Sequence, residues 1–118
     1  MTFENYTSCT LQLQERSIQE GTWTDDPETQ IAPADSTEMR TESDEMQRGT
    51  EASVTYEMVN CKSETLEGQM VTFEWSNPFY GDNSYEFEHT SGGVHTYYAS
   101  DDPNAAHAAV TAQVSEPA

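Results

Sequence analysis

Apolar and polar residues alternate along much of the chain with the two-residue period of a β-strand. The alternation is clearest in "TEASVTYEMV" (50–59) and "QMVTFEWS" (69–76), and it recurs in "TLQLQERS" (10–17), "SYEFEH" (84–89) and "VHTYYAS" (94–100). Each segment is therefore predicted to form a strand with one face toward a core. The residues expected on these inner faces are Leu11, Leu13, Ala52, Val54, Tyr56, Met58, Val71, Phe73, Trp75, Tyr85 and Phe87.

The alanine-rich segment "AAHAAVTAQVS" (105–115) is compatible with a helix or a strand. Its valines recur with period two and its apolar residues lack helical spacing, which favours a strand. The inner face would then carry Ala106, Ala108, Val110, Ala112 and Val114.

Turn-forming residues separate these strands. The segment "EGTWTDDPETQI" (20–31) is predicted to be a loop with Trp23 at its centre, and "NPFYGDN" (77–83) is predicted to be a turn. The polar segment 35–46 is either an edge strand with Met39 pointing inward or a loop. Several strands with turn signals about every ten residues predict an all-β fold, an antiparallel β-sandwich.

The length of 118 residues suits a single domain, residues 1–118. The charge is extreme, with 22 acidic and 4 basic residues and a formal net charge of -18. Self-repulsion of that size and a hydrophobic content of 34% border on disorder. The aromatic residues and the strand periodicity argue for a folded domain instead. High salt would screen the carboxylates, so we expect a halophilic protein.

An acidic mimic of nucleic acid is an alternative explanation of the charge, although the acids are spread along the whole chain. Four basic residues are too few to neutralise a phosphate backbone, so we expect no nucleic-acid partner. No apolar run is long enough to span a bilayer. The N-terminus lacks a secretory pattern, so we expect synthesis in the cytoplasm without a signal peptide, with release from the cell left open.

Cys9 and Cys61 are either one disulfide or two buried free thiols, and the missing sign of secretion favours thiols. Asn5, Tyr6 and Thr7 form a glycosylation sequon that matters only if the chain is exported.

Candidate catalytic and metal-binding groups are sparse. The histidines have no ligand spacing, the paired aspartates beside prolines fit ordinary turns, and no serine or cysteine lies in a nucleophile motif. We therefore expect no metal, no cofactor and no enzymatic activity. The residues weighed in this way are His89, His95, His107, Asp25, Asp26, Asp101 and Asp102.

Four short motifs occur in the order found in the aegerolysins, and the chain resembles that family from Asn5 to Val114. The nearest resemblance is to the small aegerolysin-type component of bacterial binary insecticidal crystal toxins. The motifs are "TLQL", Gly21-x-Trp23, Gly49-Thr50-Glu51 and Asn77-Pro78-Phe79-x-Gly81-x-Asn83-x-Tyr85.

The resemblance implies a compact antiparallel β-sandwich that recognises membrane lipid and often acts with a second, larger protein to permeabilise membranes. The implied lipid-binding residues are Trp23, Arg48, Phe79 and Tyr80 at one rim of the sandwich. Arg48 stands where lipid-binding fungal members carry a glutamate. The motif residues expected to be structural are Gly49, Thr50, Trp75, Asn77, Pro78, Gly81, Asn83 and Tyr85.

The aromatic residues around the "NPFYGDN" turn have a second interpretation. Phe73, Trp75 and Phe79 would be core or corner residues, which we favour, whereas Trp23 and Tyr80 fit either role equally. The alternative to lipid binding is an interaction module that uses strand edges or the aromatic rim to bind copies of itself, as a homo-oligomer, or another protein.

Overall fold

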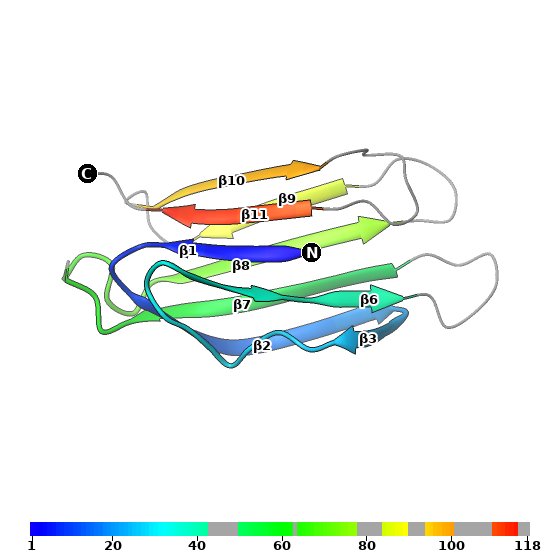
Figure 1. Cartoon of the computed structure of the whole chain (residues 1–118), viewed down its shortest axis with the longest axis horizontal. Helices are drawn as coiled ribbons and strands as arrows, with labels where there is room; N and C mark the ends of the chain where they lie inside the picture. The colour runs from blue at the N-terminus through cyan, green and yellow to red at the C-terminus, as the bar shows by residue number, and fades with distance from the viewer. Residues whose placement is uncertain (43–49, 63, 78–83, 90–93, 101–109, 116–118) are drawn as a thin grey trace.

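The computed structural model describes residues 1–42, 50–62, 64–77, 84–89, 94–100 and 110–115 (Figure 1). Two sheets pack against each other as a sandwich, and a short ribbon lies beside them. The five-stranded sheet has the order β4(Gln30–Ile31), β2(Thr10–Glu20), β7(Thr50–Val59), β8(Met70–Asn77), β9(Ser84–His89). The four-stranded sheet has the order β10(His95–Ser100), β11(Val110–Ser115), β1(Thr2–Tyr6), β5(Asp35–Glu38), and the ribbon pairs β3(Thr22–Asp25) with β6(Arg40–Glu42).

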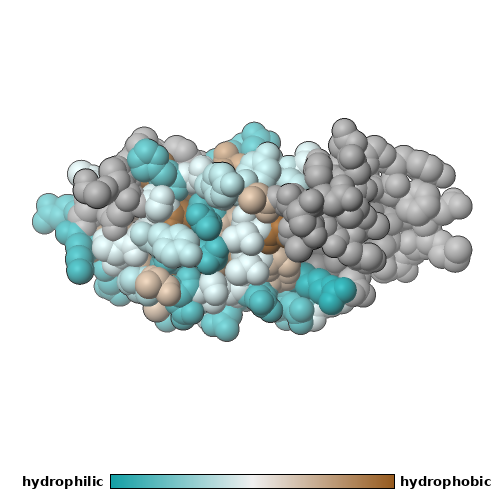
Figure 2. Space-filling model, turned by 45° about the horizontal axis from the view of Figure 1, so that its top comes forward, coloured by the Kyte–Doolittle hydropathy of each residue, from teal (hydrophilic) through white to brown (hydrophobic). Residues whose placement is uncertain are grey.

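The core lies between the two sheets and is built from the alternating positions that the sequence predicts. Every second residue of β7 is buried from Thr50 to Met58, and Phe73 of β8 is fully buried. Phe3 from the other sheet stacks on Tyr56 with ring centroids 5.5 Å apart. On the side shown in Figure 2, the described surface is mostly teal and white, with brown apolar atoms in narrow strips. Burial of the apolar inner faces of the two sheets stabilises their packing against each other.

The predicted strands are present among the described residues, with two differences and one alternative resolved. The N-terminal residues form β1, which the sequence did not predict, and β1 runs parallel to β11 within an otherwise antiparallel architecture. The expected loop 20–31 contains β3 and β4. The polar segment after residue 35 forms β5 and β6 with Met39 buried between them, which confirms the edge-strand alternative.

The turn that follows β1 is held by a buried asparagine. Asn5 has no exposed surface, and its Nδ2 donates to the carbonyls of Cys9 (2.8 Å), Ile31 (3.1 Å) and Ala32 (3.2 Å). Its Oδ1 accepts from the amide of Thr7 (3.0 Å) and from the hydroxyl of Thr7 (2.6 Å). The asparagine of the sequon is therefore inaccessible for glycosylation in the folded chain, because its amide is enclosed and already bonded.

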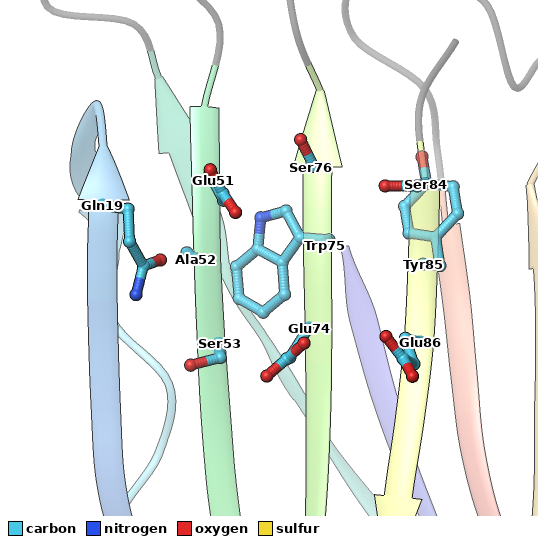
Figure 3. Close-up of a pocket in the computed structure, with 10 residues that line it drawn as sticks. All are labelled: Gln19, Glu51, Ala52, Ser53, Glu74, Trp75, Ser76, Ser84, Tyr85 and Glu86. Carbon is cyan, nitrogen blue, oxygen red and sulfur yellow. The ribbon is translucent and has the colours of Figure 1, made fainter.

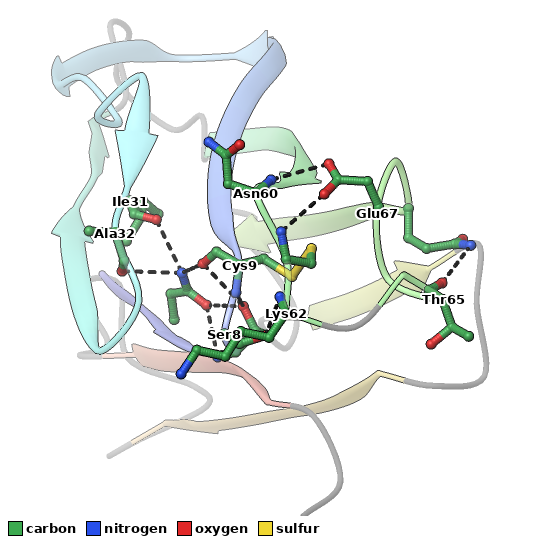
Figure 4. The surroundings of a disulfide bond; sticks show 12 residues. Ser8, Cys9, Ile31, Ala32, Asn60, Lys62, Thr65 and Glu67 are labelled. Atoms are coloured by element: carbon green, nitrogen blue, oxygen red, sulfur yellow. Dashed lines mark hydrogen bonds between the residues drawn. A yellow bond between two sulfur atoms is a disulfide. The ribbon is translucent and has the colours of Figure 1, made fainter.

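Cys9 and Cys61 form a disulfide, so the expected pair of free thiols is wrong (Figure 4). Cys9 precedes β2 and Cys61 follows β7, and these two strands pair side by side with Thr10 opposite Val59. Tertiary pairing therefore brings together two cysteines that are 52 residues apart in sequence. The Glu67 carboxylate fixes the same corner by accepting from the amides of Asn60 (3.1 Å) and Cys61 (3.0 Å).

Within the described ranges, no helix is long and apolar enough to cross a membrane.

Candidate functional site

Two tryptophans and a tyrosine lie together at the end of the sandwich where β3, β8 and β9 meet. Trp23 of β3 is half-buried and meets Trp75 of β8 edge to face, with ring centroids 5.6 Å apart. Tyr85 of β9 lies opposite Trp75 in the sheet register. We call Trp23, Trp75 and Tyr85 the aromatic rim. Trp75 is only 5% exposed, so Trp23 is the tryptophan of the rim that faces solvent in part.

The aromatic rim continues inward without a break. Phe73 stacks on Trp75 at 5.9 Å and on Tyr85 at 6.3 Å, and Phe73 itself is fully buried. Tyr98 of the opposite sheet contacts Tyr85 at 5.4 Å. These contacts confirm that Phe73 and Trp75 are core residues. The rim is therefore anchored on the core of the sandwich.

A basic side chain lies over the exposed part of the rim. The guanidinium of Arg16 from β2 lies 5.9 Å from the ring centre of Trp23, in a cation–π arrangement. Arg16 also forms an ion pair with Asp26, and both side chains are well exposed, at 44% and 65%. Such a group combines an apolar ring, a cation and an anion at one solvent-facing point.

The position of Arg16 follows from an irregularity in β2. The register between β2 and β7 shifts between Leu13 and Glu15, so that Arg16 pairs with Val54 on the inner side of the sheet. Strict alternation from Leu11 does not predict this placement. The bulge is the reason that sequence inspection missed Arg16 as a candidate site residue.

The structure describes only part of the predicted lipid-binding set. Trp23 lies at the rim, in a strand and not at the centre of a loop. Thr50 begins β7 and is buried, and its hydroxyl makes no hydrogen bond in the part of the chain that the structure describes. Asn77 is the last residue of β8. The predictions for Arg48, Gly49, Pro78, Phe79, Tyr80, Gly81 and Asn83 lie outside the described residues.

A shallow pocket of about 430 Å³ lies beside the rim, across the ends of β2, β7, β8 and β9 (Figure 3). Trp75 and Tyr85 contribute to its lining, together with short serines and a set of glutamates. The glutamates and serines sit at alternate strand positions and so share the outer face of the five-stranded sheet. The polar lining consists of Gln19, Glu51, Ser53, Glu74, Ser76, Ser84 and Glu86.

Carboxylates crowd this outer face. Glu74 lies directly opposite Glu86 in the register between β8 and β9. Partial burial, followed by the repulsion of Glu88, Glu86 and Glu51, raises the pKa of Glu74 above its ordinary value. The pocket is therefore an acidic surface, unfavourable for a phosphate group.

No group of three or more metal-ligating side chains occurs among the described residues. Of the histidines considered in the sequence, His95 is exposed on the edge strand β10 and His89 ends β9, while His107 lies outside the described ranges. Asp25 and Asp26 are exposed, and Asp26 is engaged by Arg16. Asp101 and Asp102 lie outside the described ranges.

Comparison with known proteins shows which solved structures share this fold. No protein-family model and no curated protein matches the sequence. Among solved structures, the chain is similar to the lipid binding protein Nakanori, with a TM-score of 0.81, 13% identity, and coverage of 98% of this chain and 69% of that one. It is also similar to the RahU protein, solved in complex with a Tris molecule, with a TM-score of 0.68, 12% identity, and coverage of 99% and 94%.

Both similarities are at low sequence identity and show a shared fold. They confirm the predicted all-β sandwich, which matches that of aegerolysin structures.

Proposed function

We propose that this protein is a non-enzymatic lipid-binding domain of aegerolysin type, residues 1–118, which docks on membranes through its aromatic rim. The observation that carries the proposal is the half-buried Trp23, held edge-on against Trp75 and covered by Arg16. Tryptophan and tyrosine favour the interfacial zone of a bilayer. The likeness to the lipid binding protein Nakanori and the four aegerolysin motifs support the same function.

Two arginines lie at the end of the sandwich that bears the rim. Arg16 lies over Trp23, and Arg40 of β6 lies opposite Asp25 of β3 in the ribbon register. Both arginines lie on the β3 side of the rim, whereas the glutamates of the pocket lie on the outer face of the five-stranded sheet. We therefore propose that the rim approaches the membrane with the acidic outer face of the five-stranded sheet directed away from it.

Vesicle flotation in molar KCl tests this proposal. The wild-type protein should float with at least one lipid composition, and Trp23→Ala should reduce flotation while the circular dichroism spectrum is retained. Tyr6→Ala is the matched control, because Tyr6 is 51% exposed and lies on β1, away from the rim. Absence of flotation with every lipid, in a folded protein, would contradict the proposal. Loss of folding in Trp23→Ala would assign Trp23 a structural role.

We also propose that the protein is adapted to high salt. Glu51, Glu74 and Glu86 line one shallow pocket, and their repulsion is weakened when the Debye length falls to about 3 Å in about 1 M salt. Circular dichroism during a KCl titration tests this proposal: folding should require salt, and complete folding in its absence would contradict it.

We further propose that membrane permeabilisation needs a second, larger pore-forming protein, as the aegerolysin resemblance implies. Vesicles that bind the protein alone should keep an entrapped dye, and release of the dye by this chain alone would contradict the proposal.

The disulfide bears on where the protein acts. Disulfides persist in oxidising surroundings and are rare in the reducing cytoplasm. We therefore propose that the protein is made in the cytoplasm and acts after release, when Cys9 and Cys61 become bonded. Thiol alkylation before and after release would distinguish the two redox states, and a bonded pair in the cytoplasm would contradict this order of events.

A further inference from the structure

Strand β10 is an edge of the four-stranded sheet, at the outer border of the sandwich (Figure 1). Its sequence, HTYYAS, contains no acidic, lysine, arginine or proline residue. Its pairing with β11 runs from His95 to Ser100 without a bulge. Natural sheets usually block such an edge with charge, proline or a bulge, because the unpaired backbone groups can pair with another strand. Edge β10 carries none of these three protections.

The other described edge strands are different. Edge β5 contains Asp35 and Glu38, and edge β9 contains Glu86 and Glu88. Edge β4 spans two residues, too short to offer a ladder. In a chain with a formal net charge of -18, a six-residue edge without a charged side chain is an exception that composition alone does not explain.

The edge also presents aromatic surface. Tyr97 is 60% exposed and Tyr98 is 43% exposed, and they are two of the three large exposed hydrophobic residues among those the structure describes. Alternation places Tyr97 on the outer face of its sheet, whereas Tyr98 points toward β9, where it contacts Tyr85. Both faces of β10 therefore offer an aromatic ring to an added strand.

We propose that β10 is a self-association edge, through which two copies of this chain pair antiparallel about a twofold axis and join their four-stranded sheets. In a twofold dimer, a residue i that lies opposite residue j of the copy requires that j also lies opposite i. Residues that lie opposite each other must also share a face of the sheet. Centring the pair on Tyr97 satisfies both conditions. Tyr97 then lies opposite its own copy, Thr96 opposite Tyr98, and His95 opposite Ala99.

The uncharged edge is compatible with a second copy of this acidic chain as the occupant. Two molecules that are each strongly acidic can approach only through an uncharged surface, and this register brings no carboxylate of β10 opposite another. Cross-strand aromatic pairs add stability, while like charges directly opposite would remove it. Pairing of one strand edge buries little area, so we expect a weak dimer that salt strengthens by screening the remaining repulsion.

The dimer geometry has a consequence for membrane binding, which rests on the proposed lipid-binding function. The aromatic rim lies at the end of the sandwich toward which β10 runs (Figure 1). Antiparallel pairing of β10 therefore puts the two rims at opposite ends of the dimer. One dimer would contact two lipid surfaces and cluster vesicles, whereas a monomer would bind vesicles without clustering them.

Sedimentation equilibrium at two KCl concentrations at which circular dichroism shows a folded protein, about 1 M and about 3 M, tests self-association apart from lipid binding, because no lipid is present. We expect a monomer–dimer equilibrium that tightens with salt. Tyr97→Glu should weaken the dimer about tenfold or more, because it places two carboxylates opposite each other. Ser36→Glu is the matched control, since it adds the same charge to the other edge strand of the same sheet.

Oxidative crosslinking tests the proposed register between the two copies of β10. The native cysteines are bonded to each other, so Tyr97→Cys should form a covalent dimer with its copy, whereas Ser36→Cys should remain a monomer. A wild-type protein that stays monomeric in both salts would overturn the proposal. A dimer that neither responds to Tyr97→Glu nor crosslinks through Tyr97→Cys would overturn it as well. Crosslinking decides the outcome even if Tyr97→Glu fails to fold.

Discussion

Removal of the Cys9–Cys61 disulfide is expected to destabilise the protein mainly through its unfolded state. The bond closes a loop of 52 residues, and the loop-closure relation for that length gives about 4 kcal/mol at 25 °C. The native corner should survive without the bond, because Asn5 holds the Cys9 carbonyl and Glu67 holds the Cys61 amide. The loss is a large fraction of the total for a chain of this size, which is about 6–18 kcal/mol at typical stability per residue.

Urea unfolding followed by circular dichroism at a fixed KCl concentration measures this loss. The comparison is between the wild-type protein and a Cys9→Ala/Cys61→Ala variant, and the reduced wild type serves as a control that leaves side-chain volume unchanged. We expect a free energy of unfolding lower by about 4 kcal/mol, together with a larger urea dependence because the unfolded chain becomes more extended. A loss below about 1 kcal/mol in both samples, or reaction of the untreated native protein with a thiol reagent, would refute the reasoning.

Three further predictions follow from particular contacts. Asn5→Ala should lower the free energy of unfolding by about 3–5 kcal/mol in thermal unfolding, because several buried backbone groups lose their partner, while exposed Gln12→Ala should change it little. Glu74→Gln should raise the urea midpoint near neutral pH. The raised pKa means that the folded state binds the proton more tightly than the unfolded one. The wild type therefore loses stability as the pH rises from the ordinary glutamate pKa through the raised one, and the gain from Glu74→Gln should vanish in acid. Arg16→Ala should cost about 0.5–1 kcal/mol or less and shift the tryptophan emission, because the cation over Trp23 is removed; an unchanged spectrum would contradict that contact.

Strand periodicity predicted the parts of the fold whose burial follows local alternation. Strands β7, β8 and β11 have the inner residues that the sequence indicated, because one apolar face of each meets the core, while the predicted Ala106 and Ala108 lie outside the described residues. Strand β1 was not predicted, because its inner face does not show an apolar alternation. Its two inner residues are Phe3 and Asn5, and a buried asparagine reads as a polar position unless its hydrogen-bond partners are known.

The remaining discrepancies arise from long-range geometry. The disulfide depends on the pairing of β2 with β7, which brings residues 52 apart in sequence into contact, whereas the missing secretory pattern favoured free thiols. The position of Arg16 depends on a bulge, and a one-residue shift moves a side chain to the other face of a sheet. The exposed edge of β10 depends on sheet order. Of the candidate site, Trp23 was predicted from its motif, whereas its contact with Arg16 was not.

Depth-dependent fluorescence quenching tests the central claim, docking through the aromatic rim, most directly. Vesicles with brominated acyl chains quench tryptophans that enter the bilayer, and Trp75 is too deeply buried in the protein to respond strongly. We predict quenching of the wild-type protein in molar KCl and its loss in Trp23→Phe, measured with a vesicle composition that supports flotation. Binding without quenching, or equal quenching in Trp23→Phe, would contradict docking through this rim.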